Sequence, residues 1–354
     1  MNPFIELLQI SVGGRNALSR QLTVNEWDGI LESARRQSLV GVLFDALSSL
    51  PQEQFPPKDI ARRWASLAVK IGNRNLLLNA RSAELSAIFA SAGFNGTVLK
   101  GQGIAQYYPN PISRQPGDID LWVDGGAGKV IAFLRSRYPV SNIQIHHADA
   151  RIFDDVETEI HYRPSWSYVP SVDRKYVGWY ASQWPRQIEK ANEYGFCATT
   201  TEFNLVYLLM HMFRHVFIEG IGLRQFMDYY YVLISSDDGG RHRAAETVES
   251  LSLSGFAGAA MYVLREVFGM EGRYAFVPVN EKAGSLLLEE IMEGGNFGYF
   301  RSGGRPDAGK GRVVRGLHRS IRNLRLLSYY PMEVICYPFW MIRHWMWKKR
   351  NRYI

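Results

Sequence analysis

The sequence predicts an α+β fold in which a small mixed β-sheet is flanked by N-terminal and C-terminal helical regions. Short apolar runs and one alternating run, separated by Gly and Pro, gather in one part of the chain. On both sides of it, apolar residues recur at helical spacing over longer stretches. The 354 residues therefore divide into an N-terminal helical region, an α/β core, a helical domain and a basic, aromatic C-terminal tail: 1–92, 93–165, 166–300 and 301–354.

The composition is that of a globular chain long enough for two domains or one large one. Its two cysteines, Cys197 and Cys336, lie far apart and lack metal-site spacing, so we expect a reducing compartment and no disulfide framework. The N-terminus has no basic stretch ahead of an apolar core, and no window of about 20 residues is apolar and charge-free. We therefore expect a cytoplasmic protein without a signal peptide or a transmembrane helix.

The net charge of +7 is unevenly distributed. Residues 301–354 carry thirteen Lys and Arg against two acids, Asp307 and Glu333, so the tail is +11 and the first 300 residues are −4. A basic tail on a mildly acidic body indicates an anionic partner, which could be nucleic acid, a membrane surface or an acidic polymer.

The N-terminal region is predicted to be helical in 25–50 and 61–92, with a break at the proline-rich 51–57. We assign no chemistry to it. In the core, Pro109 and Pro111 stop a short helix. The predicted order is strand 95–99, helix 102–108, strand 119–123, helix 129–138, strand 141–147 and strand 155–162.

The pattern becomes helical again after residue 200, where threonines suited to capping precede the apolar positions. Further helices are predicted at 223–234 and 313–327, and a Gly-rich loop at 294–311. An aromatic segment, 329–347, follows.

Asp118 and Asp120 stand one residue apart on the predicted strand 119–123, so their side chains point to the same face. Pairs of acids on surface strands are common, so the pair alone is not specific. Lys100 and Gly101 lie at the end of the preceding strand, and Arg114 lies in a proline-bounded loop four residues before Asp118. The later strand has Glu157, Glu159 and His161 on its polar face, and pairing within a mixed sheet can bring Glu159 beside the two aspartates.

Three carboxylates on adjacent strands would repel one another without a cation. Oxygen ligands of this kind suit Mg²⁺, with Mn²⁺ as the alternative, and Mg²⁺ also binds substrate phosphates. Two such ions can activate an attacking hydroxyl and stabilise a leaving pyrophosphate. Lys100 and Arg114 would neutralise a triphosphate, and backbone N–H groups near Gly101 could hold it.

The motif LKGQGIAQYY, followed by Arg114, GDIDLWV and the later EIHY, resembles the nucleotidyltransferase superfamily with the DNA polymerase beta-type catalytic core. Within it, the sequence is similar to a bacterial group known as uncharacterised nucleotidyltransferases. It also resembles the bacterial toxin-type nucleotidyltransferases, in which K-G-G precedes D-I-D. The specific motifs cover about 98–123 and 156–163, and a looser similarity extends over 211–233.

This resemblance implies that Asp118, Asp120 and Glu159 are the catalytic, metal-binding carboxylates. It implies that Gly101 lies at the nucleotide-binding turn, with Lys100 and Arg114 as phosphate contacts. The chain departs from the family pattern at this turn, because Gln102 follows Gly101 where Gly or Ser is usual and the gap to Asp118 is longer. Glu159 is preferred to Glu157 because it matches the E-x-H pattern.

Four further side chains are candidate nucleotide contacts: Gln102, His161, Arg224 and Asp228. His161 could orient a metal ligand or contact a phosphate, or simply make structural hydrogen bonds. Arg224 and Asp228 have the i, i+4 spacing of a helix ion pair, yet they fall in the looser family similarity and could lie beside the nucleotide or acceptor.

Two histidine pairs carry less information. His211 and His215 have an i, i+4 spacing that metal sites use, but no third ligand stands out nearby. His146 and His147 are adjacent and predict nothing specific.

The tail begins with a basic stripe at helical spacing: Arg312, Arg315, Arg319, Arg322 and Arg325. The segment 331–352 then mixes Trp340, Trp345 and Trp347 with basic residues. Such a segment suits peripheral contact with a membrane or an anionic polymer, and the alternative is packing on the body. Pro338 argues against one long helix.

The leading hypothesis is a Mg²⁺-dependent enzyme that moves a nucleoside monophosphate group from an NTP, such as ATP, to an acceptor hydroxyl. The acceptor could be a small molecule, a glycan intermediate, a protein or RNA, and the sequence does not select among them. The alternative is a non-catalytic protein that binds a nucleotide or anionic partner on the same fold. The intact set Asp118, Asp120 and Glu159 favours the enzyme.

Overall fold

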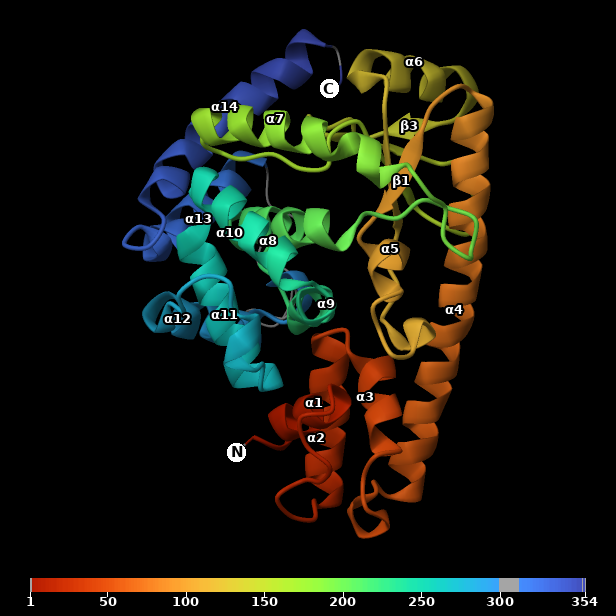
Figure 1. Cartoon of the computed structure of the whole chain (residues 1–354), viewed down its shortest axis with the longest axis vertical. Coiled ribbons are helices and arrows are strands. Elements are labelled where there is room, and N and C mark those ends of the chain that lie inside the picture. Colours follow the sequence, from red (N-terminus) through yellow and green to blue (C-terminus); the bar gives the residue numbers. More distant parts are fainter. Residues whose placement is uncertain (1, 299–311, 352, 354) are drawn as a thin grey trace.

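A computed structural model describes residues 2–298, 312–351 and 353 of the chain. It confirms the predicted α+β class, with a five-stranded mixed sheet flanked by helices (Figure 1). The long helix α4, Lys58–Ser91, runs along one side of the molecule, from the N-terminal helices at one end to the sheet and α6 at the other. No helix in the described part of the chain is long and apolar enough to cross a membrane.

The N-terminal region is helical, as predicted. It contains α1 (Pro3–Ser11), α2 (Val24–Arg36) and α3 (Val40–Leu47), followed by the short 3-10 helix η1 (Gln52–Gln54) and α4. A capping box fixes the start of α2, because Thr23 and Glu26 each accept a hydrogen bond from the other's backbone N–H. Ser38, with φ of 57°, separates α2 from α3 within the predicted stretch 25–50.

The sheet has the strand order β1-β2-β5-β4-β3. Only β2 and β5 pair in parallel; the other neighbours are antiparallel. The strands are β1 (Gly96–Leu99), β2 (Ile119–Val123), β3 (Val140–Ser141), β4 (His147–Ala150) and β5 (Thr158–His161). The elements between β1 and β3 are α5 (Gly101–Ala105), η2 (Pro111–Ser113) and α6 (Gly126–Arg137).

The prediction of one strand over 141–147 is wrong. The chain leaves the sheet after β3 and re-enters it at β4, and Asn142 has a positive φ of 41° at the break. A positive φ is incompatible with a continuous strand. The consequence is that His147 begins β4 directly opposite His161 of β5.

The second helical region contains α7 (Pro170–Gln187), α8 (Thr201–Ile218), α9 (Leu223–Ile234), α10 (Asp238–Ser250), α11 (Ser254–Phe268), η3 (Gly272–Tyr274), α12 (Glu281–Gly294) and η4 (Asn296–Gly298). The predicted helix at 223–234 coincides with α9. Thr200 caps α8 as predicted, since its side chain accepts a hydrogen bond from the backbone N–H of Phe203. From residue 299 on, the predicted loop at 294–311 lies outside the described residues.

The tail forms α13 (Arg312–Asn323), η6 (Leu324–Leu326) and α14 (Pro331–Arg350). The expectation that Pro338 prevents one long helix is wrong, because Pro338 lies inside α14. Burial of Val334 and Tyr337 and the stacking of Trp340 on Trp166 hold the helix to the body on both sides of the proline. Tertiary packing therefore outweighs the hydrogen bond that proline removes.

Two hydrophobic cores meet along α4 and the sheet. Trp64 and Ile71 of α4 belong to the core shared with the N-terminal helices and α8 to α12, whereas Leu85 belongs to the core between the sheet and α6. In β2, Leu121 faces the α6 side and Trp122 faces the other, where its ring lies 5.5 Å from that of Phe203 in α8. The division into four independent segments stays a prediction.

Replacing Leu85 with alanine should lower the free energy of unfolding by about 2–5 kcal/mol, because its side chain is 0% exposed and its removal leaves a cavity. Leu76→Ala on the same helix is the control, because Leu76 is 56% exposed and its loss should cost within about 0.5 kcal/mol. Urea unfolding followed by circular dichroism measures both. Equal destabilisation by the two variants would contradict the described packing of α4.

Candidate active site

Strand register brings the three predicted carboxylates to one place. Asp120 of β2 pairs directly with Glu159 of β5, and Asp118 precedes β2 on the same face as Asp120. All three line one cavity of about 1120 Å³. Glu157 also lines this cavity, but it is exposed and precedes β5, whereas Glu159 lies opposite Asp120.

Lys100 and His161 neutralise the carboxylate of Asp120 from two sides. The Lys100 Nζ and the His161 Nε2 lie 2.8 Å and 2.9 Å from Oδ1 of Asp120. The His161 Nε2 also lies 3.3 Å from Oε2 of Glu159. Lys100 has φ of 46° between β1 and α5, and this unusual backbone conformation accompanies the approach of its side chain to Asp120.

The electrostatics differ sharply between the two aspartates. Burial and the charges of Asp120 and Glu159 raise the pKa of the Asp118 carboxyl to about 7. Burial also disfavours the charged form of Asp120, but Lys100 and His161 outweigh it and hold the pKa of Asp120 far below its ordinary value. For His161, hydrogen bonds to Asp120 and Glu159 likewise outweigh burial and raise the pKa of the imidazole. One carboxyl of the site thus resists ionisation beside a stabilised anion.

The adjacent His146 and His147 predicted nothing specific, and Asp149 was not a candidate, yet β4 and the residue before it bring all three to the site. His147 Nδ1 lies 3.5 Å from Oε2 of Glu159 and 2.8 Å from Nε2 of His146, and His147 Nε2 lies 3.2 Å from Oδ1 of Asp149. Burial lowers the pKa of both histidines, so they are held neutral. The alternation of His147 and Asp149 in the segment HADA was the signal that could have placed both on the polar face of a strand.

Arg114 lines the cavity, but its guanidinium is engaged by Asp228 of α9. Its Nε and Nη2 atoms donate to the two carboxylate oxygens of Asp228, each at 2.7 Å, and both side chains are buried. The hydroxyl of Tyr108 donates to Oδ1 of Asp228 at 2.6 Å. This bidentate pair fixes the loop before β2 to α9, and so supports Asp118 and Asp120.

Gln102 and Gly101 differ in where the structure places them. Gly101 lines the cavity with φ of 36°. Gln102 is buried away from the carboxylates, where its side-chain amide donates to Oδ1 of Asn79 at 2.6 Å on α4. The structure thus brings Lys100, Gly101, Arg114, His161, Arg224 and Asp228 to the cavity and does not bring Gln102 there.

On α8, His211 and His215 line the same cavity on either side of Arg214. Arg214 Nη2 lies 3.4 Å from Nδ1 of His211 and 3.1 Å from Nε2 of His215. Groups of His and acidic side chains with ligand atoms close enough for a metal occur in the described chain, but none of them includes His211 or His215.

The C-terminal tail forms part of the cavity wall. Trp340, Met341, His344 and Lys348 of α14 line it together with Arg319 of α13. The ring of Trp340 stacks on Trp166 with a centroid distance of 5.1 Å, and Trp166 in turn lies 4.2 Å from the ring of His146. The tail therefore packs on the body next to the carboxylates.

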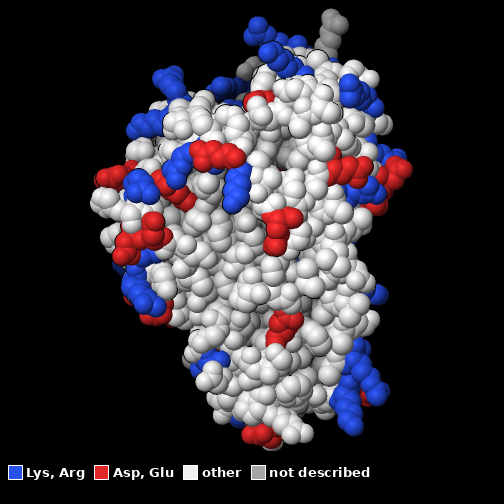
Figure 2. All heavy atoms as spheres, turned by 45° about the vertical axis from the view of Figure 1, so that its right-hand side comes forward, with Lys and Arg blue, Asp and Glu red and all other residues white. Residues whose placement is uncertain are grey.

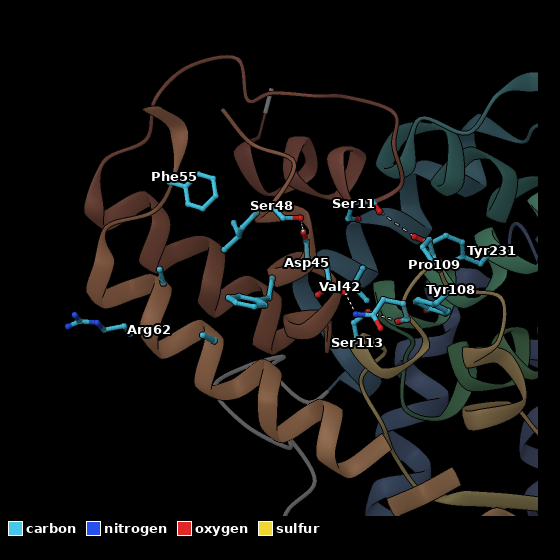
Figure 3. A pocket seen from close by; sticks show the side chains of 15 residues that line it. Ser11, Val42, Asp45, Ser48, Phe55, Arg62, Tyr108, Pro109, Ser113 and Tyr231 are labelled. Atoms are coloured by element: carbon cyan, nitrogen blue, oxygen red, sulfur yellow. Dashed lines mark hydrogen bonds between the residues drawn. The ribbon is translucent and has the colours of Figure 1, made fainter. Parts of the chain in front are cut away.

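A second cavity, of about 670 Å³, lies between α1, α3, α4 and the loop before β2 (Figure 3). The charged residues that line it are Asp45 and Arg62. Asp45 accepts a hydrogen bond from Asn110 at 2.8 Å, and Arg62 pairs with Asp59. Its walls are mainly apolar or neutral, so it offers none of the chemistry of the carboxylate cavity.

The chain was compared with protein families, curated proteins and solved structures. A family model described as "Uncharacterised nucleotidyltransferase" matches residues 23–269. The chain belongs to this family. It is accordingly an enzyme of the class that transfers phosphorus-containing groups, and the predicted nucleotidyltransferase relationship is confirmed at that level. No curated protein and no solved structure matches the chain. The match extends from the start of α2 to the end of α11, so the tail lies beyond it.

The donor groups of this nucleotidyltransferase fit a divalent cation. Asp120, Glu159 and His161 present ligand atoms within 4.8 Å of one another, and so do His147, Asp149 and Glu159. Each of these two groups offers two carboxylates and one imidazole, and carboxylate oxygens are the ligands that Mg²⁺ and Mn²⁺ accept; Asp118 lines the same cavity but belongs to neither group. Burial, together with the charges of Asp120 and Glu159, raises the pKa of Asp118, and a bound cation would offset both effects.

Replacing Asp228 with asparagine should lower the free energy of unfolding by about 3–5 kcal/mol, because it leaves the buried guanidinium of Arg114 without its anionic partner. Asp155→Asn is the matched control. Asp155 pairs with Arg81 at 2.9 Å on the surface, where such a pair contributes about 1 kcal/mol or less. Thermal and urea unfolding measure the difference. An Asp228→Asn protein as stable as the control would contradict the supporting role of the Arg114–Asp228 pair.

Proposed function

We propose that this nucleotidyltransferase moves a nucleoside monophosphate group from an NTP to an acceptor hydroxyl, with Mg²⁺ or Mn²⁺ at Asp118, Asp120 and Glu159. The observation that carries the proposal is the register of β2 and β5, which sets Asp120 against Glu159 beside Asp118 and Lys100 in the large cavity. This arrangement also supports the resemblance to the DNA polymerase beta-type core, which stays part of the proposal.

Divalent cations bound there would make the attacking hydroxyl more acidic and neutralise the leaving pyrophosphate. The residues of the chain have separate tasks around them. Asp118 and Asp120 supply the oxygen ligands, and His161 holds the carboxylates of Asp120 and Glu159 in place through Nε2. Glu159 is 29% exposed where Asp120 is 3%, so of these two paired carboxylates Glu159 is the one that an incoming acceptor hydroxyl can reach. In this proposal its Oε atoms accept the hydroxyl proton.

The triphosphate would lie along Lys100 and Gly101. Both line the cavity, and the ammonium of Lys100 can exchange Asp120 for a phosphate oxygen when a cation occupies the carboxylates. Arg224 also lines the cavity, and its Nη1 donates to the carbonyl of Gln115 at 3.4 Å, in the loop before Asp118. Arg114 and Asp228 tie this loop to α9, and Gln102 contributes by anchoring α5 to α4.

The residues that line the cavity indicate the chemical class of the acceptor but not its identity. The part of the cavity lined by α13 and α14 contains Arg319, Lys348 and Trp340, which suit an acceptor with anionic and apolar parts. Glycan intermediates, RNA, proteins and small molecules with such parts all fit this description of the acceptor. The proposed donor is an NTP such as ATP. A cytoplasmic location stays part of the proposal.

Asp120→Asn and Glu159→Gln should each lower turnover by about 100-fold or more, because each removes a charged group from the reacting centre. The control is Glu157→Gln, two residues before Glu159 and exposed, which should keep turnover within about twofold. The measurement incubates each of the four α-³²P-labelled NTPs with Mg²⁺ and cell extract, and follows labelled product and pyrophosphate.

Two results would count against the enzyme. One is labelled product from Asp120→Asn at the rate of the natural protein. The other is binding of an NTP with no product from any NTP in any fraction of the extract, which would favour the non-catalytic binding protein.

Mn²⁺ affinity should fall as the pH drops below about 7, because a proton on Asp118 competes with the cation. The sign follows from the raised pKa: the carboxyl is charged above pH 7 and protonated below it. Each further pH unit should weaken binding by about tenfold until other ligands titrate. Electron paramagnetic resonance of free Mn²⁺ measures this. Asp118→Asn should bind more weakly at pH 8 and lose the step near pH 7; a step that survives would assign it to another group.

A further inference from the structure

The tail exposes an unusual amount of apolar surface. Of the 18 large hydrophobic side chains exposed in the described chain, 11 belong to residues 312–351. In α14 the exposed members recur every three or four residues and form one stripe along the helix. They are Met332, Ile335, Phe339, Ile342, Trp345 and Met346, with exposed fractions between 51% and 68%. Scattered exposed hydrophobics are ordinary, but a continuous stripe marks an interaction surface.

The preceding part of the tail repeats the pattern. Its exposed apolar residues are again three or four positions apart across α13 and η6: Val314, Leu317, Ile321, Leu324 and Leu327. Gly316 brings α13 close to α14, since a Cβ at that glycine would meet the terminal methyl of Met341 at 3.0 Å. We call α13, η6 and α14 together the tail hairpin.

The opposite side of α14 is firmly packed. Tyr337 is 2% exposed, Val334 is buried, and Trp340 stacks on Trp166. Asn323, at the end of α13, is buried and donates to the carbonyl of Phe217 in α8 at 3.1 Å. The hairpin therefore has an inner apolar face against the body and an outer apolar face toward solvent, which internal packing does not explain.

The charged side chains exposed along the α14 stripe are all of one sign. Arg343, Lys349 and Arg350 are exposed at the edges of the α14 stripe. The only acid in residues 312–354 is Glu333, and it is buried. Figure 2 shows mostly basic side chains at the upper end of the molecule, where α6 and the end of α14 lie in Figure 1, and both signs over the rest of that face.

The apolar stripe and its flanking basic residues together discriminate between the possible binding partners of this surface. A second copy of the chain would bring like charges together around the apolar contact. Nucleic acid would satisfy the basic residues but leave Phe339, Ile342 and the other apolar side chains in water. An anionic lipid bilayer satisfies both, because its acyl boundary accepts the apolar stripe and its headgroups attract the flanking Lys and Arg.

We propose that the tail hairpin binds the surface of an anionic lipid bilayer, with the outer stripe of α14 at the boundary between headgroups and acyl chains. Ile342 and Trp345 belong to both the stripe and the lining of the carboxylate cavity, so docking sets the cavity opening at the lipid surface. Presentation of an acceptor from the membrane would follow, and that consequence alone depends on the proposed function.

The test is sedimentation of the full-length protein with sucrose-loaded vesicles, without nucleotide or metal. The protein should bind phosphatidylcholine vesicles that contain about one third phosphatidylserine at least about tenfold more tightly than pure phosphatidylcholine vesicles. Raising the salt concentration to about 1 M should weaken binding, because it screens the basic residues. Tryptophan fluorescence should shift to the blue on binding, as Trp345 leaves water.

Two matched pairs of variants locate the contact. Ile335→Ser with Phe339→Ser should weaken vesicle binding by about tenfold or more, whereas Val69→Ser with Leu76→Ser, at equally exposed positions on α4, should leave it unchanged. Arg343→Glu with Lys349→Glu should remove the preference for anionic lipid, and Lys70→Glu with Lys282→Glu should preserve it. Circular dichroism and melting curves establish that each variant is folded.

Three results would overturn the proposal. The first is absence of binding to anionic vesicles by the folded natural protein. The second is self-association in analytical ultracentrifugation that Ile335→Ser with Phe339→Ser abolishes, without vesicle binding, which assigns the face to a second copy. The third is tighter binding to RNA than to vesicles, lost in Arg343→Glu with Lys349→Glu. None of these results depends on nucleotidyl transfer, so they are distinguishable from failure of the proposed function.

Discussion

The parallel pairing of β2 with β5 brings two carboxylates together, and much of the surrounding structure offsets their electrostatic repulsion. It places the carboxylates of Asp120 and Glu159 directly opposite each other, an arrangement of like charges that destabilises a sheet. Lys100 and His161 meet this repulsion at Oδ1 of Asp120, within 2.9 Å. Burial, and then the charges of Asp120 and Glu159, raise the pKa of Asp118 despite the nearby charge of Lys100. Asp120 is therefore stabilised as an anion, whereas the carboxyl of Asp118 is easily protonated. A cation bound at this site would favour the ionised form of Asp118.

Side chains outside the carboxylate cluster keep this arrangement rigid. Gln102 ties α5 to α4 through Asn79, and so fixes the turn at Lys100. The Arg114–Asp228 pair ties the loop before β2 to α9. These contacts hold the turn and the loop to long helices, which position reacting groups more precisely than mobile loops do. Gln102, Arg114 and Asp228, which the sequence suggested as nucleotide contacts, thus hold the turn and the loop of the site in position.

The sequence was sufficient for what depends on local pattern and failed where tertiary contacts decide. Alternation predicted the strand at Glu159 and its face, and spacing put Asp118 and Asp120 together. It could not show that Gln102 turns toward Asn79, because no local pattern encodes the partner of a buried amide. The split into β3 and β4, which brings His147 to Glu159, depends on the positive φ of Asn142. The prediction that Pro338 ends the helix failed because the low helix propensity of proline is a weak guide where aromatic stacking holds a helix in place.

The tail hairpin connects the outer surface to the chemistry through a short chain of ring contacts. From the cavity, His147 hydrogen-bonds to His146, the His146 ring meets Trp166, and Trp166 stacks on Trp340 of α14. Packed aromatic rings do not deform continuously. They couple distant residues when the rings can switch between discrete packing arrangements. A partner that holds the outer face of α14 therefore acts on the same helix that lines the carboxylate cavity. The family match ends at residue 269, before this helix, so the carboxylate cavity is lined both by residues inside the match and by residues of the tail beyond it.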